Sequence, residues 1–380
     1  MAVLTVAFFI SGHGFGHASR EVEVVNALLA GGGVDIVLRT SADAGLLART
    51  VRGPYRLLPG PCDPGIVQRD SVTHDDAASV AAVREFYGDF DRHVDDEARR
   101  LTGVAVDLVV GDIPPLAFVV ASTLGIPSLA IANFTWDWIY ETMPGLEHDS
   151  TTIATIRGAY RQATRALALP FAGGMDMFPR CGTLPLVARH ATLTADETRA
   201  HLRPYVDAAR PIALLSFGGY GLPALTIDRL PGLTDWTILS TDRTAGDARA
   251  LPGVITIPES MFLTGAVRYE DLVAAADVVI TKPGYGIIAE CAANDTALVY
   301  TSRGAFREYD VLVEEMPNYV RCAFLAPDDL RRGRWREAID RARHAPRPSR
   351  PRADGAAVAA GVIREMLADA ARSTPRPAAR

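Results

Sequence analysis

The sequence has few cysteines and no excess of positive charge. Its 380 residues include four cysteines that are far apart and form no C-x-x-C pair. This argues against a disulfide framework or a structural zinc site and favours reduced thiols in a cytoplasm. The formal net charge of −6 leaves no global basic field to hold a nucleic acid. No apolar run reaches the ~18–20 residues of a transmembrane helix, and the short apolar start, 2–10, lacks the basic region of a signal peptide. We therefore expect a cytoplasmic protein without a nucleic-acid partner.

The chain is long enough for two domains, and both halves show an α/β pattern. Single cores rarely exceed ~250–300 residues, and 48% hydrophobic residues supply material for two cores. Strand-like apolar runs alternate with helical stretches in the first half at 3–10, 34–38, 107–110 and 128–131. The pattern resumes in the second half at 211–216, 237–240, 254–257, 277–280 and 297–300. Such alternation of mostly apolar strands with helices indicates parallel sheets covered on both faces.

Domain boundaries follow from this alternation. We predict an N-terminal domain over 1–195 and a C-terminal domain over 205–345, joined by a mixed polar stretch. A Pro/Arg-rich segment follows, and a last helix is expected over 356–372. Residues 373–380 form a Pro/Ala/Arg tail that is expected to be disordered.

A turn rich in glycine and histidine, Ser11-Gly-His-Gly-Phe-Gly-His17, follows the first predicted strand. It reads G-x-G-x-G instead of the dinucleotide-binding G-x-G-x-x-G, and no acidic residue ends the second strand, so a nicotinamide site is not expected. His13 and His17 are candidate general bases, because imidazole titrates near neutral pH. The alternative role of such a histidine is to cap the turn or to bond a neighbouring loop. Two histidines between glycines, at the carboxyl end of a parallel strand, favour the base.

Five sequence blocks together resemble a known family. They are Gly12-His-Gly-Phe-Gly-His-Ala-Ser-Arg20, Asp107-Leu-Val-Val-Gly-Asp-Ile-Pro-Pro115, Asn133-Phe-Thr-Trp-Asp-Trp-Ile-Tyr140, Leu215-Ser-Phe-Gly-Gly219 and Ala276-Asp-Val-Val-Ile-Thr-Lys-Pro-Gly-Tyr-Gly286. They look like the N-terminal, glycosyltransferase-like half of plant L-arabinokinases and their bacterial relatives. They are more distantly similar to the N-acetylglucosaminyltransferase of peptidoglycan precursor synthesis and to UDP-glycosyltransferases. The likeness covers roughly 3–340, and no small-molecule kinase domain is expected after it.

The resemblance implies an α/β fold of the GT-B type, in which two Rossmann-like, doubly wound parallel-sheet domains face a cleft. His17 matches the family's base, which deprotonates the acceptor hydroxyl, and Asp112 matches an acidic residue that orients such a base. A helix N-cap is the alternative role of Asp112. His13 is the second candidate base, or a contact to the acceptor or a phosphate. Gly14 and Gly16 are expected on the acceptor side.

Aromatic residues gather just after the strand predicted at 128–131, at Phe134, Trp136, Trp138 and Tyr140. Trp136 is the candidate for stacking on the acceptor or on a sugar face. An aromatic core beneath the cleft is the alternative, because alternation along this segment would bury some of these rings.

The same resemblance implies that the nucleotide sugar lies mainly on the C-terminal side. Small residues in two later glycine turns let the backbone approach a diphosphate, although a plain tight turn is the alternative for the first of them. Lys282 is expected to neutralise the diphosphate leaving group. The candidate donor contacts from these turns are Gly218, Gly219, Lys282, Gly284, Tyr285 and Gly286.

Two acidic residues are expected to bind hydroxyl groups of the donor. Glu290 matches the residue that binds the ribose in relatives, with a solvated helix face as the alternative. Glu308, followed by Asp310, matches an acidic position that contacts the donor sugar, while Arg303 and Arg307 are available for phosphate. A surface charge cluster is the alternative for this block.

The predicted function is transfer of a sugar from a nucleoside diphosphate sugar, UDP-linked by the resemblance, to a hydroxyl of a small-molecule or carrier-linked acceptor. We expect a hexosyl- or pentosyltransferase that needs no metal, because the D-x-D sequence at 89–91 lies in a charged stretch typical of a solvated helix. No cofactor is expected besides this co-substrate, and a peripheral membrane contact stays open. A nucleotide-sugar 2-epimerase and a non-catalytic nucleotide-sugar-binding protein are the alternatives.

Overall fold

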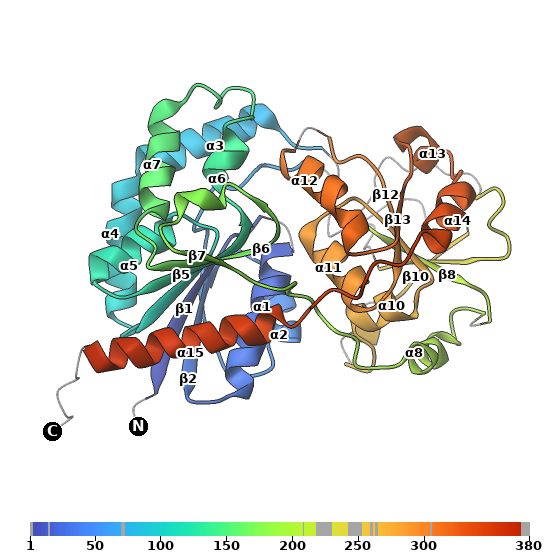
Figure 1. Ribbon diagram of the computed structural model, residues 1–380, viewed down its shortest axis with the longest axis horizontal. Coiled ribbons are helices and arrows are strands. Elements are labelled where there is room, and N and C mark those ends of the chain that lie inside the picture. The colour runs from blue at the N-terminus through green and yellow to red at the C-terminus, as the bar shows by residue number, and fades with distance from the viewer. Residues whose placement is uncertain are drawn as a thin grey trace. The chain divides into compact units, whose positions relative to one another are not determined.

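The computed structural model contains two compact α/β units (Figure 1). The first unit consists of Met1–Val67, Asp75–Val187 and Asp354–Arg380, and the second of Gln68–His74 and Ala188–Ala353. The chain therefore passes from the first unit to the second after Val187 and returns after Ala353. The structure describes residues 3–13, 16–69, 73–207, 209–217, 230–241, 253–258, 261–262, 265–304 and 306–373.

The first unit is built on a seven-stranded parallel sheet. Its strands are β1 Leu4–Ile10, β2 Val34–Thr40, β3 Arg56–Pro59, β4 Leu108–Asp112, β5 Ser128–Phe134, β6 Arg165–Gly173 and β7 Cys181–Thr183. They run in the order β3-β2-β1-β4-β5-β6-β7, with every neighbouring pair parallel. The strand order reverses between β1 and β4. In open α/β sheets ligands bind outside the carboxyl ends of the strands at such a switch point.

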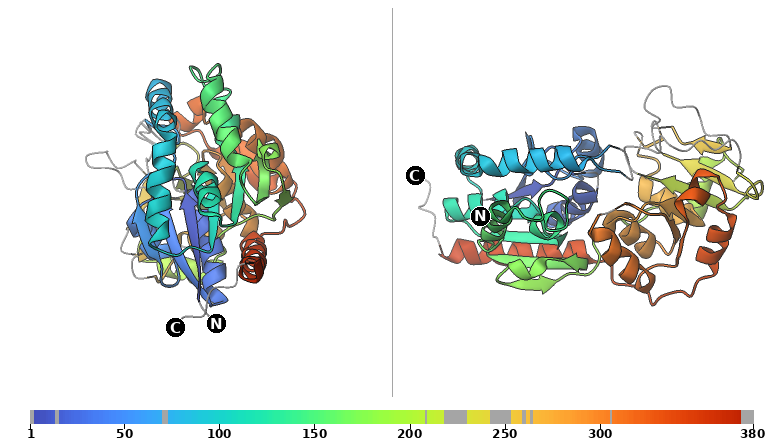
Figure 2. Two further views of the ribbon diagram at one scale, coloured as in Figure 1. Left: turned by 90° about the vertical axis from the view of Figure 1, so that its left-hand side faces the viewer. Right: turned by 90° about the horizontal axis from the view of Figure 1, so that it is seen from above.

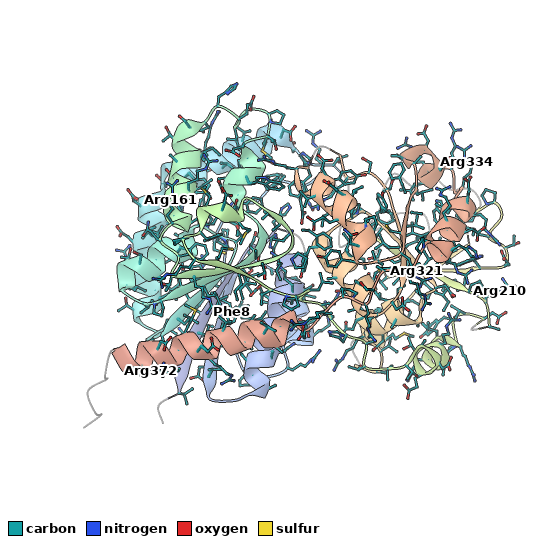
Figure 3. The ribbon with its side chains drawn as sticks, in the orientation of Figure 1. Phe8, Arg161, Arg210, Arg321, Arg334 and Arg372 are labelled. Atoms are coloured by element: carbon teal, nitrogen blue, oxygen red, sulfur yellow. The ribbon has the colours of Figure 1, made fainter. Side chains whose placement is uncertain are left out.

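Helices cover both faces of this sheet. They are α1 Gly16–Ala30, α2 Ala44–Thr50, α3 Asp76–Gly88, α4 Phe90–Thr102, α5 Leu116–Leu124, α6 Trp136–Tyr140, α7 Ser150–Tyr160 and α15 Gly355–Ser373, with a 3-10 turn, η1, at Met175–Met177. Both views in Figure 2 show α4 and α15 on opposite sides of the strands. All seven residues of β5 are buried as a result, as expected for a parallel strand covered twice. Phe8 of β1 is fully buried, whereas Arg161 and Arg372, labelled in Figure 3, are exposed.

The last helix belongs to the first unit. α15 packs against α1, and Arg364 Nη2 donates to the carbonyl oxygens of Leu28 (2.7 Å) and Gly32 (3.0 Å). Carbonyls at the end of a helix lack intrahelical partners, so this arginine caps α1. The helix spans 355–373, close to the predicted 356–372. The predicted tail beyond it, 374–380, lies outside the described residues.

The second unit repeats the architecture with a six-stranded parallel sheet. Its strands are β8 Ile212–Ser216, β9 Thr237–Ser240, β10 Val254–Thr256, β11 Val278–Thr281, β12 Ala297–Tyr300 and β13 Cys322–Phe324, in the order β10-β9-β8-β11-β12-β13. Its helices are α8 Ala195–Leu202, α10 Tyr269–Ala275, α11 Tyr285–Ala293, α12 Glu308–Glu315, α13 Pro327–Arg331 and α14 Arg336–His344, with a 3-10 turn, η2, at Met316–Asn318. The strand order reverses here between β8 and β11. These two sheets confirm the predicted α/β class.

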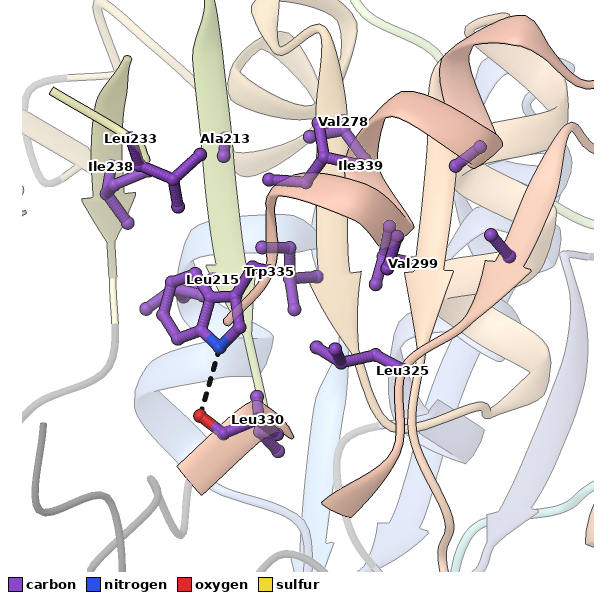
Figure 4. Packing of buried hydrophobic residues seen from close by; sticks show 14 of the residues in the cluster. Ala213, Leu215, Leu233, Ile238, Val278, Val299, Leu325, Leu330, Trp335 and Ile339 are labelled. Atoms are coloured by element: carbon purple, nitrogen blue, oxygen red, sulfur yellow. Dashed lines mark hydrogen bonds between the residues drawn. The ribbon is translucent and has the colours of Figure 1, made fainter. Parts of the chain in front are cut away.

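A tryptophan at the start of α14 fills the core on one face of the second sheet. Trp335 is fully buried, and Figure 4 shows its ring packed beside Leu215 of β8. Its indole Nε1 donates to the carbonyl oxygen of Leu330 at 3.0 Å, so the polar end of the ring is satisfied within the core. The hydrogen bond joins α14 to α13, and the packing of the Trp335 ring on β8 covers that face of the sheet. No helix among the described residues is long and apolar enough to cross a membrane.

Candidate active site

The β1–α1 turn and the end of β4 meet at the carboxyl edge of the first sheet. Ile10, the last residue of β1, pairs with Asp112, the last residue of β4, and the Ser11 amide donates to the Asp112 carbonyl oxygen at 2.8 Å. Gly16 begins α1 and His17 follows in its first turn. The topology therefore brings the predicted base and the predicted acid together at the switch point. Gly14 and Phe15 lie outside the described residues.

His17 and Asp112 form a buried histidine–carboxylate pair. The imidazole Nδ1 of His17 lies 2.9 Å from Oδ1 of Asp112, and the two residues are 6% and 1% exposed. An ionised carboxylate can only accept a hydrogen bond, so this contact places the proton of the neutral imidazole on Nδ1. The second ring nitrogen, Nε2, then carries the lone pair. This is the arrangement of a general base oriented by an acid.

An arginine holds the other side of the Asp112 carboxylate. Arg20 Nε donates to Oδ2 at 2.6 Å, Nη2 donates to Oδ1, and Nη1 donates to Oδ1 of Asn133 at 2.5 Å. Burial alone would raise the pKa of Asp112, but the charge of Arg20 and then that of His17 lower it below its usual value. Asp112 is therefore ionised at neutral pH. Its side chain pairs with α1 instead of capping the helix that follows it.

The two histidines of the turn differ in their hydrogen bonds. His13 Nδ1 accepts from the Ile66 amide at 3.3 Å, so a neutral His13 carries its proton on Nε2. The two rings therefore differ at Nε2. In His13 this nitrogen carries the proton and can donate a hydrogen bond, whereas in His17 it carries a lone pair and can accept one. The ring centroids lie 6.5 Å apart. The geometry favours His17 as the base and His13 as a donor to a bound group.

A second buried carboxylate, that of Asp63, is hydrogen-bonded to the first residue of the glycine- and histidine-rich turn. Asp63 accepts hydrogen bonds from Ser11 Oγ (3.0 Å) and from the indole Nε1 of Trp136 (2.9 Å). Trp136 is fully buried and stacks on Tyr140, with ring centroids 5.4 Å apart. This placement fits the predicted aromatic core and does not fit a stacking surface for an acceptor. Burial raises the pKa of Asp63 to about 6, against the lowering effect of its two donors.

This raised pKa predicts how stability depends on pH. The unfolded pKa of an aspartate is ~3.9, so the folded protein binds the Asp63 proton more tightly than the unfolded chain does. The contribution is present below pH ~4 and is lost as the pH rises through about 6, a difference of roughly 2–3 kcal/mol. We expect Asp63→Asn to gain stability relative to the wild type by that amount between pH 4.5 and 7.5, measured by urea unfolding. An equal stability difference at both pH values would contradict this.

Arg20, Asn133 and Asp63 are site residues that the sequence did not predict. Arg20 lies three residues after His17, so one helical turn places both side chains on the same face of α1. This three-residue spacing in the sequence would have allowed Arg20 to be predicted beside His17. Asn133 and Asp63 come from the end of β5 and from a loop after β3, and no local pattern in the sequence indicates their partners, which are Arg20 for Asn133 and Ser11 and Trp136 for Asp63.

In the second unit, the described donor candidates begin at the end of β8. Ser216 Oγ is hydrogen-bonded to the Tyr269 hydroxyl, and the Ser216 carbonyl oxygen accepts from Thr281 Oγ1 at the end of β11. The first bond joins β8 to α10, and the second joins β8 to β11 at the switch point of this sheet. Gly218 and Gly219, predicted to approach a diphosphate, lie outside the described residues.

The turn after β11 opens directly into a helix. Lys282 is half-buried and follows β11, and Gly284 is the N-cap of α11. Tyr285 and Gly286 lie in the first helical turn, whose amides have no intrahelical partner. A Cβ atom at Gly284 would meet no other atom within 4 Å, so this edge of the turn has open space beside it. The arrangement suits an anion, as predicted for the diphosphate.

Glu290 is buried in a charged cluster, which corrects the alternative of a solvated helix face. It is 3% exposed, and its Oε1 accepts from Arg189 Nε at 2.6 Å. Arg189 also pairs with Glu270 at 3.6 Å and lies over the ring of Tyr269 at 5.1 Å. Burial alone would lower the pKa of Arg189, but Glu290 and Glu270 raise it. The role of Glu290 in binding a ribose stays a prediction.

Glu308 is also buried, so the alternative of a surface charge cluster is wrong for this residue. It begins α12 and is 4% exposed, and its Oε2 accepts from Arg303 Nη1 at 2.8 Å. The same nitrogen donates to the Pro283 carbonyl oxygen at 3.4 Å. Arg303 therefore connects the loop after β12 to the loop after β11. The structure thus brings Glu308 and the Lys282–Gly286 segment to one edge of the second sheet.

The D-x-D sequence at 89–91 does not follow a strand. It lies at the beginning of helix α4. Asp89 is the N-cap position of α4, is exposed and pairs with Arg92 at 2.9 Å. Among the residues that the structure describes, no group of three or more His, Cys, Asp or Glu side chains is placed to hold a metal ion.

The two parallel-sheet units define the GT-B fold class, and solved structures share this fold. The chain matches glycosyltransferase SnogD from Streptomyces nogalater over 96% of its length and 99% of that chain, with 17% identity and a TM-score of 0.56. It matches MurG from Acinetobacter baumannii over 95% and 99%, with 16% identity and a TM-score of 0.53. It matches Phytolacca americana UGT2 over 98% and 96%, with 13% identity and a TM-score of 0.53. Identities this low show a shared fold alone.

One sequence relative is more similar. The chain is 29% identical over 347 residues to L-arabinokinase from Arabidopsis thaliana, a match that covers 89% of this chain and 32% of the relative. The chain thus spans about a third of the length of that protein. These similarities confirm the resemblance inferred from the sequence blocks. No protein-family model matches the chain.

Proposed function

We propose that this protein transfers a sugar from a nucleoside diphosphate sugar to a hydroxyl group, with His17 as the general base. The observation that carries the proposal is the buried contact of 2.9 Å between His17 Nδ1 and Asp112 Oδ1 at the switch point of the first sheet. This contact leaves Nε2 to accept a proton. A structural neighbour, Phytolacca americana UGT2, is complexed with UDP-2fluoro-glucose and pterostilbene, which supports a nucleotide-sugar donor.

In this reaction His17 Nε2 takes the proton of the acceptor hydroxyl as its oxygen attacks the anomeric carbon of the sugar. The bond between that carbon and the diphosphate oxygen breaks, and the diphosphate leaves with the electron pair. Asp112 stabilises the imidazolium that forms. The first-turn amides of α11 and the Lys282 ammonium offset the developing negative charge, so the reaction needs no metal ion.

We assign a UDP-linked hexose or pentose as the donor. A second neighbour, VinC, is solved in complex with dTDP, so the fold accommodates more than one nucleobase. The acceptor is a small molecule or is carrier-linked, and the reacting group is a hydroxyl, because an imidazole base is matched to an alcohol proton that becomes acidic only in the transition state.

A thermal-shift screen against nucleoside diphosphates and their sugars tests the proposal. Any ligand that binds the folded state alone stabilises it by about 2.7 kcal/mol at 100 times its Kd. We expect UDP and UDP-sugars to raise the melting temperature, and Lys282→Met to reduce that rise. The matched control is Lys282→Arg, which keeps the positive charge.

Four outcomes would contradict the proposal. Stabilisation by none of the nucleotides would contradict donor binding as such. Conversion of the sugar without an acceptor would indicate an epimerase, and binding without turnover would indicate a non-catalytic protein. ATP-dependent phosphorylation of a free sugar would indicate kinase chemistry, which the name of the sequence relative describes for that longer protein.

A further inference from the structure

The guanidinium of Arg20 occupies more of the Asp112 carboxylate than His17 does. Arg20 Nε lies 2.6 Å from Oδ2, and Nη2 contacts Oδ1, the same oxygen that His17 Nδ1 approaches at 2.9 Å. The pairing is bidentate and side-on, and such pairs fix the plane of the carboxylate. All three residues are at least nine-tenths buried, so water does not compete for these contacts.

Arg20 is itself held from a second strand. Its third nitrogen, Nη1, donates to Oδ1 of Asn133 at 2.5 Å. Asp112 ends β4 and Asn133 lies in β5, while Arg20 and His17 lie one turn apart on α1. The guanidinium therefore joins three elements around the imidazole. Contacts with the ends of two strands, at Asp112 and Asn133, therefore fix the position of the guanidinium.

We propose that Arg20 is a positioning residue for sugar transfer, whose guanidinium locks the Asp112 carboxylate so that the His17 proton stays on Nδ1. The inference rests on the proposed function for its catalytic consequence, although the tautomer it predicts is a property of the free protein. Arg20 Nη2 also lies 3.1 Å from His17 Nδ1 and carries two hydrogens, so a hydrogen bond from Nη2 to Nδ1 is the competing arrangement and would place the imidazole proton on Nε2. The shorter, charge-assisted contact of 2.9 Å between Nδ1 and the Asp112 carboxylate favours the proton on Nδ1.

Other ionisable groups surround this pair. His13 lies 6.5 Å from His17 between ring centroids, and Asp63, whose pKa burial raises to about 6, interacts with the His17 ring. Glu21 is completely buried, and burial followed by the nearby charge of Asp112 raises its pKa well above the usual range. Asp112 and Arg20 are the oppositely charged groups in direct contact with the imidazole, so the carboxylate that holds the ring is itself held by a fixed positive charge.

Nitrogen NMR of the histidine rings tests the tautomer directly. The His17 signals are assigned by their loss in His17→Gln, and the ring nitrogen shifts then show which nitrogen holds the proton. We expect the proton on Nδ1 in the wild type. Arg20→Lys keeps the charge but loses the fork that grips both oxygens, so we expect a mixture of tautomers. A wild-type proton on Nε2, or an unchanged tautomer in Arg20→Lys, would overturn the proposal.

The kinetics of sugar transfer per folded molecule separate positioning from a structural role. We expect Arg20→Lys and Arg20→Met to lower kcat about 10–100-fold, with less change in the KM of the donor, because Arg20 acts on the base through Asp112. A variant that only loses stability would keep its kcat per folded molecule, and that result would overturn the proposal.

Arg39 supplies a matched control. Its Nε and Nη2 grip both oxygens of Glu97 at 2.9 and 2.8 Å, and both residues are buried in the same unit. Arg39→Lys should therefore lower stability while leaving the His17 tautomer and the kcat per folded molecule unchanged. If the wild type transfers no sugar, the proposed function fails, while the NMR result still decides the positioning role of Arg20.

Discussion

Replacing His17 with alanine is expected to lower the kcat of sugar transfer by about 10²–10⁴-fold, the usual contribution of a positioned general base. The imidazole contacts Asp112 and lies in the first unit, whereas the proposed diphosphate contacts lie in the turn after β11 of the second unit. Loss of the ring should therefore remove an interaction made in the transition state and leave nucleotide binding intact. The measurement is kcat for transfer together with the melting-temperature rise caused by UDP.

His13→Ala is the control for this prediction. His13 lies in the same turn, but its Nδ1 accepts from the Ile66 amide and its Nε2 carries the proton. Removing it should raise the KM of the acceptor more than it lowers kcat, because a donor to a bound group acts on binding as well as on chemistry. Full transfer activity in His17→Ala with intact UDP binding would refute the assignment of the base. A larger loss of kcat in His13→Ala than in His17→Ala would reverse the two roles.

The elements that the sequence predicted best are short, mostly apolar strands. The predicted strands 237–240 and 297–300 coincide with β9 and β12, and 3–10 differs from β1 by one residue. A buried parallel strand must be apolar on both faces, so its composition alone distinguishes it from a helix face. Among the strands at the sheet edges, β10 was predicted at 254–257, whereas β3, β7 and β13 were not. β7, Cys181–Thr183, has only three residues and no apolar run.

The pairing of His17 with Asp112 was predicted from the family motif. The residues that hold this pair and its turn in place were not predicted. Polar groups converge at the carboxyl edge of a parallel sheet, and a strand order of β1 next to β4 is enough to bring these two strand ends together. Arg20 reaches the pair from α1, Asn133 of β5 holds Arg20, and Asp63 from the loop after β3 holds Ser11 in the turn. Which of several charged side chains fills such a position depends on side-chain packing, and no periodicity in the sequence reports it.

Asp112→Asn is expected to lower kcat by about 10³–10⁴-fold, nearly as much as loss of His17 itself. An asparagine has one oxygen where the carboxylate has two. Arg20 donates to both carboxylate oxygens, from Nε to Oδ2 and from Nη2 to Oδ1, so an amide loses one Arg20 contact in either orientation. In the orientation that keeps the Nε contact, the amide nitrogen occupies the position of Oδ1, facing His17 Nδ1. That nitrogen can only donate, so Nδ1 must accept, and the imidazole proton moves to Nε2. The base is present but carries its proton on the wrong nitrogen.

The effect of Asp112→Asn therefore depends on Arg20, because Arg20 orients the side chain at position 112. The decisive measurements are kcat and the histidine nitrogen shifts, with circular dichroism to confirm that the variant folds. Asp63→Asn is the matched control, because it makes the same change in a buried carboxylate held by two neutral donors, Ser11 and Trp136. The serine hydroxyl can rotate to accept from the new amide, so that kcat should stay within about tenfold of the wild type. A kcat for Asp112→Asn within the same range would mean that the carboxylate does not set the tautomer of His17, and the base would then act without an orienting acid.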